Sequence, residues 1–221
     1  MVRGFQIAVL LLLLAAFASS QASSSPATVT FTLDFPGSRP GHYSLRVDQS
    51  GASHYESSGD SSAESGLEDD FTYDFTMSAG TREKIFDLAA KTGYFQTDLD
   101  AHRKNMAFTG KKTLSYKDAQ RSGESTYNYS QNLVVQELTD LFQSLSATLE
   151  FGHRLDYDRR YQKLALAEEL KRMEESARMS PPTEIQAIAP ILQQIINDPG
   201  VINVTRARAQ RLLEGPPVRG Q

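Results

Sequence analysis

Residues 27–35 read Ala-Thr-Val-Thr-Phe-Thr-Leu-Asp-Phe, and they carry the clearest secondary-structure pattern of the chain. Four apolar side chains alternate there with threonine or aspartate: Val29, Phe31, Leu33 and Phe35. A period of two residues is typical of a β-strand that buries one face and exposes the other. We therefore expect a half-buried strand at this position, within a mainly antiparallel sheet.

Further strands are expected on the C-terminal side of this one. Glycine and proline at 36–41 predict a turn, after which alternation resumes at 42–48 and continues, past a second turn, into 52–56. Alternating aromatic residues predict a fourth strand at 71–77. Residues 111–117 and 124–130 indicate a second hairpin, in which Leu114 and Tyr116 are expected to face Tyr127 and Tyr129.

Helices alternate with and then follow these strands. Ser78 is a candidate N-cap for a helix at 82–91, and Gly93 stands where a left-handed residue usually ends a helix. From Asn132 the apolar spacing changes to three and four residues, which predicts an amphipathic helix that packs on the sheet. We expect Gly152 to break or bend it. Three more helices are expected at 155–179, from Thr183, and at 201–213.

This order of elements predicts an α+β protein, with a mainly antiparallel sheet packed by one or two helices and followed by a C-terminal helical region. We divide the chain into a signal peptide at 1–22, an α+β domain at 23–150, a helical extension at 151–214 and a disordered tail at 215–221. Serine, glycine and acidic residues predict a flexible loop at 57–70 within the α+β domain.

The first residues have the pattern of a secretory signal peptide. One positive charge at Arg3 precedes an uninterrupted apolar run at 7–17, and small residues follow at Ser20 and Ala22. A bilayer-spanning helix needs about 20 apolar residues, so this run is too short for one. We expect cleavage after Ala22, or else after Ser20. The mature protein is therefore expected to be exported, periplasmic or extracellular, without a stable membrane span.

Composition narrows the function classes further. The chain has no cysteine, which excludes disulfides, thiol catalysis and thiolate zinc sites, and favours a bacterial envelope over a eukaryotic secretory route. Its formal net charge is −4, and removal of Arg3 with the signal peptide makes it −5. A negative protein is a poor partner for the phosphate backbone, so we expect no nucleic-acid binding.

Motifs for common chemistries are missing from the sequence. The four histidines, His42, His54, His102 and His153, have no spacing typical of metal ligands. The chain has neither the Gly-x-Ser-x-Gly pattern of serine hydrolases nor a glycine-rich loop for phosphates or dinucleotides. We therefore expect no cofactor, and the sequence assigns no catalytic residue.

One acidic cluster could hold a cation. It consists of Glu64, Glu68, Asp69, Asp70 and Asp74. Calcium prefers six to eight oxygen ligands, which makes these residues calcium candidates. The glycine and closing glutamate of the usual calcium loop are absent, so a solvated acidic loop is the competing interpretation.

Two stretches carry resemblances. Residues 41–51, Gly-His-Tyr-Ser-Leu-Arg-Val-Asp-Gln-Ser-Gly, with a helix that ends in Thr-Gly-Tyr-Phe at 92–95, resemble uncharacterised exported bacterial domains of unknown function over about residues 29–149. Residues 188–213, with Pro190, Asp198, Arg206 and Ala209, are similar to a single HEAT-type helical repeat. The second resemblance implies paired helices that make protein contacts.

The leading functional hypothesis is a non-enzymatic interaction or structural module of the bacterial cell envelope. Its expected partner is an envelope protein, bound through the C-terminal helices. One alternative is an envelope hydrolase that uses carboxylates of the sheet, and its sign would be a deep pocket with perturbed carboxylates. Another is a calcium-binding protein that uses the acidic segment at 64–74.

Overall fold

Six strands form one antiparallel sheet in the computed structural model, which describes residues 26–59, 70–179 and 182–215. The strands are β1 (Thr28–Asp34), β2 (His42–Asp48), β3 (Ala52–Ser58), β4 (Asp70–Thr76), β5 (Lys111–Lys117) and β6 (Ser122–Tyr127). Their order across the sheet is β4-β3-β2-β1-β5-β6. The helices of the C-terminal region follow the sheet in the chain, which confirms the α+β class.

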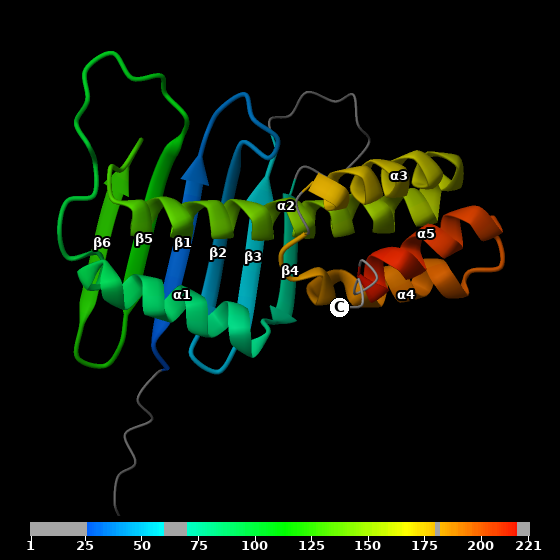
Figure 1. The fold of residues 1–221 in the computed structure, drawn as a ribbon, viewed down its shortest axis with the longest axis horizontal. Coiled ribbons are helices and arrows are strands. Elements are labelled where there is room, and N and C mark those ends of the chain that lie inside the picture. Colours follow the sequence, from blue (N-terminus) through cyan, green and yellow to red (C-terminus); the bar gives the residue numbers. More distant parts are fainter. Residues whose placement is uncertain (1–25, 60–69, 180–181, 216–221) are drawn as a thin grey trace, which may run out of the picture.

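The helices are α1 (Ala79–Lys91), α2 (Leu133–Tyr161), α3 (Lys163–Met179), α4 (Ala189–Asn197) and α5 (Asn203–Glu214), with short 3₁₀ helices η1 (Gly93–Phe95) and η2 (Ile185–Ile188). Figure 1 shows α1 and α2 lying side by side across one face of the sheet. α2 crosses the strands and continues past β4, where it joins α3, α4 and α5. These last elements form the helical extension.

The face of the sheet under α1 and α2 is apolar. Val29, Phe31 and Leu33 of β1 are buried there, as the alternation at 27–35 predicts. The Phe31 ring stacks on Phe142 of α2, with ring centroids 5.2 Å apart. Ile85 of α1 is fully buried in the same core. The sheet therefore gains its stability from one covered face.

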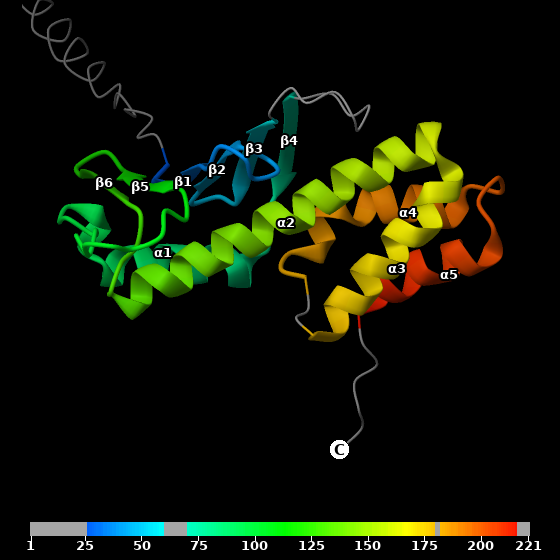
Figure 2. The same cartoon turned by 90° about the horizontal axis from the view of Figure 1, so that it is seen from above.

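The opposite face of the sheet is polar. On β1 it carries Thr28, Thr30, Thr32 and Asp34, which alternate with the buried residues. In the part of the chain that the structure describes, no helix or strand covers this face (Figure 2). We refer to it as the open face.

The predicted N-cap and C-terminal end of α1 are confirmed, although the helix begins at Ala79, three residues before the predicted start at 82. The Ser78 side chain accepts a hydrogen bond from the backbone N–H of Thr81, as expected of an N-cap. Gly93 has a φ of 66°, in the left-handed region that glycine adopts readily.

The expected break at Gly152 is wrong, because α2 runs from Leu133 to Tyr161 without interruption. Gly152 is buried, and a Cβ atom at this position would lie 2.5 Å from Cγ2 of Ile188. The glycine thus lets η2 approach α2 closely. The chain changes direction at Gln162 instead, which has non-helical dihedral angles.

The hairpin of β5 and β6 differs from the predicted register. Leu114 lies opposite Ser125 and Tyr116 opposite Gly123, while Tyr127 faces Lys112. The cause is a tighter turn, in which the Asp118 carboxylate accepts hydrogen bonds from the next backbone N–H groups at 120 and 121. β6 therefore begins at Ser122, two residues earlier than predicted.

The boundaries at other positions also need correction. β3 extends to Ser58 and β4 begins at Asp70, so both ends of the loop expected at 57–70 belong to strands. The third helix expected from Thr183 is replaced by η2 and α4. The signal peptide at 1–22, residues 60–69 and the tail at 216–221 lie outside the described residues. Of the helices described, none is both long and apolar enough to span a membrane.

Candidate functional site

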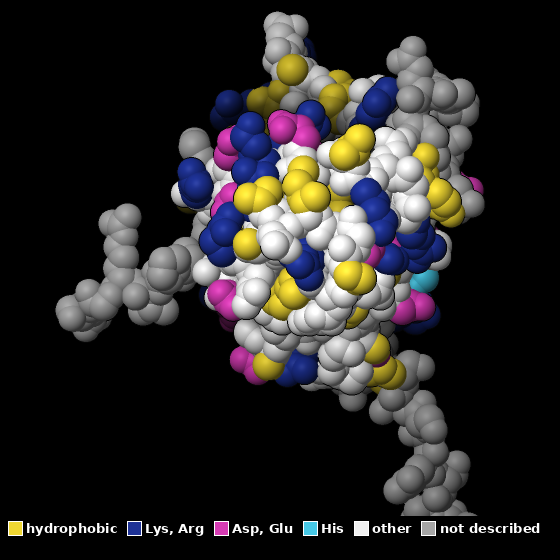
Figure 3. Space-filling model, turned by 90° about the vertical axis from the view of Figure 1, so that its right-hand side faces the viewer, with side chains coloured by type: hydrophobic (Ala, Val, Ile, Leu, Met, Phe, Trp, Pro, Cys, Tyr) yellow, Lys and Arg dark blue, Asp and Glu magenta, His cyan; other side chains and the backbone are white. Residues whose placement is uncertain are grey.

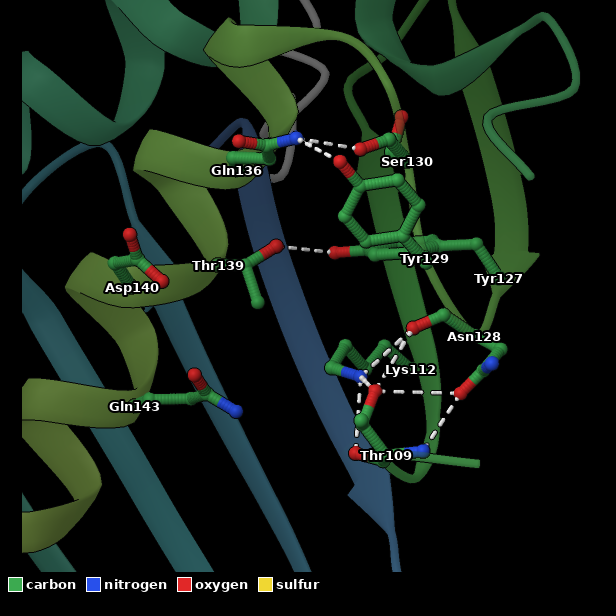
Figure 4. Close-up of a pocket in the computed structure, with 10 residues that line it drawn as sticks. All are labelled: Thr109, Lys112, Tyr127, Asn128, Tyr129, Ser130, Gln136, Thr139, Asp140 and Gln143. Atoms are coloured by element: carbon green, nitrogen blue, oxygen red, sulfur yellow. Dashed lines mark hydrogen bonds between the residues drawn. The ribbon is translucent and has the colours of Figure 1, made fainter. Parts of the chain in front are cut away.

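A pocket of about 270 Å³ lies between α2 and the two strands β5 and β6 (Figure 4). Its wall comes from the loop before β5, from β5 and β6, from the segment after β6 and from one side of α2. The residues that line it are Thr109, Lys112, Tyr127, Asn128, Tyr129, Ser130, Gln136, Thr139, Asp140 and Gln143.

Lys112 is the chemically unusual residue of this pocket, because it is only 6% exposed. Its Nζ donates to the carbonyl oxygens of Asn128 at 2.9 Å and Gly110 at 3.2 Å, and its distances to the carbonyl and hydroxyl oxygens of Thr109 are both 3.0 Å. No ion pair among the described residues involves Lys112. Burial lowers the pKa of its ammonium group.

An ammonium group has three hydrogens, and four oxygen atoms surround Lys112 Nζ. Its donors are therefore satisfied by the protein itself, and a ligand would have to displace one of these contacts. The arrangement joins the loop at 109–110 to the end of β6. We assign Lys112 a structural role in shaping the pocket.

Lys112→Met is expected to lower the free energy of unfolding by about 2 kcal/mol, because it keeps the apolar stem but leaves buried carbonyl oxygens without a donor. Lys111→Met is the matched control, since Lys111 is exposed on the same strand. Surface substitutions usually change stability by less than about 0.5 kcal/mol. Urea unfolding measures the change in the free energy of unfolding for both variants. Equal changes in Lys112→Met and Lys111→Met would contradict the structural role of Lys112.

A second polar cluster joins β3 to α2. The Tyr55 hydroxyl donates to Oε1 of Glu150 at 2.8 Å and lies 2.8 Å from Oγ of Ser146. The Ser57 hydroxyl donates to the same Glu150 oxygen at 2.7 Å. Burial, together with the negative charge of Glu150, raises the pKa of Tyr55. Ser57, expected in a flexible linker, is thus a buried strand residue that anchors α2.

The hydrolase hypothesis requires carboxylates that could take part in catalysis. Asp158 of α2 has a raised pKa, mainly through burial and also through the charge of Glu169. Glu169 forms an ion pair with Arg154, with Nε and Oε1 2.6 Å apart. Neither Asp158 nor Glu150 lines the pocket beside Lys112, whose lining has one carboxylate, Asp140.

A second pocket, of about 460 Å³, is more open and lies between α1 and α2. Its lining includes Glu137 and Asp140, and Lys84 Nζ pairs with Oε1 of Glu137 at 2.8 Å. Among the described residues, neither of these two carboxylates accepts a hydrogen bond from a serine, threonine or tyrosine hydroxyl group. The hydrolase therefore stays a hypothesis without a supporting site.

His42 and His54 lie on the open face and do not meet. His42 Nδ1 lies 2.6 Å from Oδ1 of Asp34 on β1, and His54 Nδ1 lies 2.6 Å from Oδ1 of Asp74 on β4. Each histidine contacts an aspartate on a different neighbouring strand. The pairs are exposed and separate, so they assemble no common site.

The other two histidines are also apart. His102 Nε2 lies 2.6 Å from Oδ2 of Asp98, and this hydrogen bond raises the pKa of His102. The His153 ring of α2 stacks on Phe71 of β4, with centroids 4.0 Å apart. Within residues 26–59, 70–179 and 182–215, no group of three or more acidic or histidine side chains is placed to hold a metal ion.

The calcium candidates are divided between described and undescribed residues. Asp70 and Asp74 lie four residues apart on the exposed side of β4. The other three candidates, Glu64, Glu68 and Asp69, lie outside the described residues. Calcium binding by this cluster stays a prediction.

Four large apolar side chains are exposed at the outer end of the helical extension. Tyr161 ends α2 and is 70% exposed, and Leu164 at the start of α3 is 95% exposed. Ile202 and Val204, where α5 begins, are 64% and 58% exposed. We call these four residues the helical tip. Figure 3 views this end of the molecule and shows apolar side chains among lysines and arginines.

Polar contacts hold the two halves of the helical tip together. Lys163, between Tyr161 and Leu164, places its Nζ 2.8 Å from Oδ2 of Asp198 in the α4–α5 turn. Oδ1 of Asp198 accepts a hydrogen bond from the backbone N–H of Gly200. The α2–α3 joint and the α4–α5 turn are therefore connected at the base of the exposed apolar surface.

Sequence comparisons add no family assignment. No family model matches the chain, and no curated protein shows significant sequence similarity to it. The resemblances to uncharacterised exported domains and to a single HEAT-type repeat stay predictions.

The sequence contained a usable signal for Lys112 but not for the helical tip. Lys112 alternates with Leu114 and Tyr116, so the strand period already places it on the covered face. Tyr161 and Leu164 follow Tyr157 at helical spacing, which suggests one buried stripe. The break at Gln162 changes the direction of the chain between them and leaves both exposed.

Proposed function

We propose that the protein is an exported, non-enzymatic interaction module of the bacterial cell envelope, which binds an envelope protein through its helical extension. The observation that carries this proposal is the exposure of four large apolar side chains together at the helical tip. Single exposed apolar residues are normal on protein surfaces, whereas several large ones at the same end of a molecule favour an interaction site.

The helical tip has the features of a binding surface that is formed in advance. The Tyr161 ring packs against Tyr157 with centroids 5.0 Å apart, which restricts its conformations before a partner binds. The ion pair of Lys163 and Asp198 fixes the neighbouring turn. Little conformational entropy is then lost on binding, and aromatic residues in such positions often dominate affinity.

Leu164→Glu tests the proposal, since a buried leucine side chain contributes about 1.5–3 kcal/mol and a glutamate there would be desolvated. The mature protein is immobilised, incubated with the envelope fraction of its source and crosslinked, and the recovered partner is identified. Its affinity for purified wild-type and variant protein is then measured. We expect Leu164→Glu to weaken binding at least tenfold.

Leu133→Glu is the matched control, because Leu133 is 76% exposed at the other end of α2. This variant should bind the partner as the wild-type protein does. Equal binding by Leu164→Glu and wild type would show that the partner does not use the helical tip. Circular dichroism confirms that both variants fold, since exposed substitutions cost little stability.

A further inference from the structure

β4 forms an edge of the sheet with one set of backbone groups free. The backbone N–H of Met77 donates to the carbonyl of Gly51 at 2.8 Å, directly after the register pair of Thr76 with Ala52. In an antiparallel pair, hydrogen-bonded positions alternate along the strand. The N–H and C=O groups of Thr72 and Asp74 therefore point away from β3.

These outward backbone groups have no partner in the described part of the chain. None of the described backbone or side-chain hydrogen bonds involves the N–H or C=O of Thr72 or Asp74. An unpaired strand edge is a template for another strand.

The helices continue beyond this free edge. Phe71 of β4 stacks on His153, and α2 extends eight residues further, to Tyr161. At 1.5 Å per residue this is about 12 Å, whereas adjacent strands are about 4.8 Å apart. Tyr73 of β4 also donates a hydrogen bond from its hydroxyl to the carbonyl of Ala187 in η2. A strand added to β4 would thus find a helical layer under its inner face, as the other strands do (Figure 1).

The side chains of β4 determine what such a strand should contain. On the inner side, Phe71, Tyr73 and Phe75 form a ladder of partly buried rings with centroids 6.0 and 6.1 Å apart. On the open face, β4 presents the carboxylates of Asp70 and Asp74, and the side chain of Asp74 is 85% exposed. An added strand gains most from apolar side chains on the inner side and cations on the open face.

We infer that the edge of β4 binds an extended segment of a partner protein, with lysine or arginine at alternate positions and apolar residues between them, as a seventh strand. A second copy of this chain is a poor occupant. Antiparallel pairing of two β4 strands about Thr72 would place Asp70 of each opposite Asp74 of the other, and like charges in that position are destabilising. The β4 edge shares no residue with the helical tip, so either surface can bind when the other does not.

The probe is a fluorescein-labelled peptide of seven residues with alternating lysine and valine, and the control peptide has glutamate in place of lysine. Binding to the mature protein is measured by fluorescence anisotropy at low salt. We expect saturable binding of the lysine peptide at least tenfold tighter than that of the glutamate peptide. The amide protons of Thr72 and Asp74 should become protected from hydrogen exchange when it binds.

Two variants separate strand addition from simple charge attraction. Thr72→Pro removes an outward N–H and leaves the bonds to β3 intact, so it should weaken binding of the lysine peptide at least tenfold. The double variant Asp70→Lys/Asp74→Lys should bind the glutamate peptide more tightly than the lysine peptide. Three results would each overturn the proposal. The first is a lack of saturable binding at 1 mM peptide (roughly the weakest affinity of interest), and the second is an equal affinity of Thr72→Pro and wild type for the lysine peptide. The third is a wild-type dimer that Thr72→Pro dissociates.

Discussion

Gly152→Val is expected to lower the free energy of unfolding by about 3 kcal/mol, the upper range for overpacking a buried site. Gly152 is buried where α2 meets η2, and a Cβ there would lie 2.5 Å from Cγ2 and 3.1 Å from Cβ of Ile188. Cβ is the branch point of the buried Ile188 side chain and Cγ2 is the methyl group bonded to it, so neither atom is the far end of a flexible chain that could move aside. At an open position in a helix, replacing glycine would instead increase stability.

Ala147→Val provides the comparison, because Ala147 is exposed on the same helix and valine there costs only its helix propensity, less than about 1 kcal/mol. Thermal or urea unfolding gives both values. If Gly152→Val were as stable as Ala147→Val, the close contact of α2 with η2 would be wrong.

Raising the pH from 10 to 12 is expected to unfold the protein through its buried tyrosines. Burial raises the pKa of Tyr127 to about 12, and it also raises those of Tyr43 and Tyr55, which lie on the same covered face. The ordinary pKa of tyrosine is about 10. The folded state therefore holds these protons more tightly than the unfolded state, and stability falls as the pH rises above 10.

For Tyr127 alone, a pKa that rises from about 10 in the unfolded state to about 12 in the folded state corresponds to about 2 kcal/mol of stability lost by pH 12. Tyrosinate absorbance and circular dichroism, recorded together, measure the transition. Tyr127→Phe should make the loss of stability with pH less steep. Ionisation of all tyrosines with unchanged circular dichroism would contradict the burial of these hydroxyl groups.

The covered and open faces of the sheet could be predicted from the sequence because strand alternation depends on local hydrophobicity alone. Val29, Phe31 and Leu33 show this directly. The register of β5 and β6 could not be predicted. It depends on how the Asp118 carboxylate closes a turn, and a shift of two residues preserves the alternation and hence the pattern.

Errors in the helical region have a different physical origin. Glycine lowers helix propensity, so Gly152 suggests a break when only the chain is considered. Packing against Ile188 reverses that interpretation, and this contact joins residues 36 positions apart. The cluster of Tyr55, Ser57 and Glu150 likewise depends on tertiary structure, because no local pattern brings β3 to α2.

The uninterrupted α2 also has a consequence for avidity. It supports both the β4 edge, near His153, and the helical tip, at Tyr161, and these two residues are about 12 Å apart along the helix. A partner that occupied the tip and carried its own extended segment would hold that segment at a high effective concentration beside β4. Two weak contacts on one rigid helix would then combine into a much longer-lived complex than either contact gives alone.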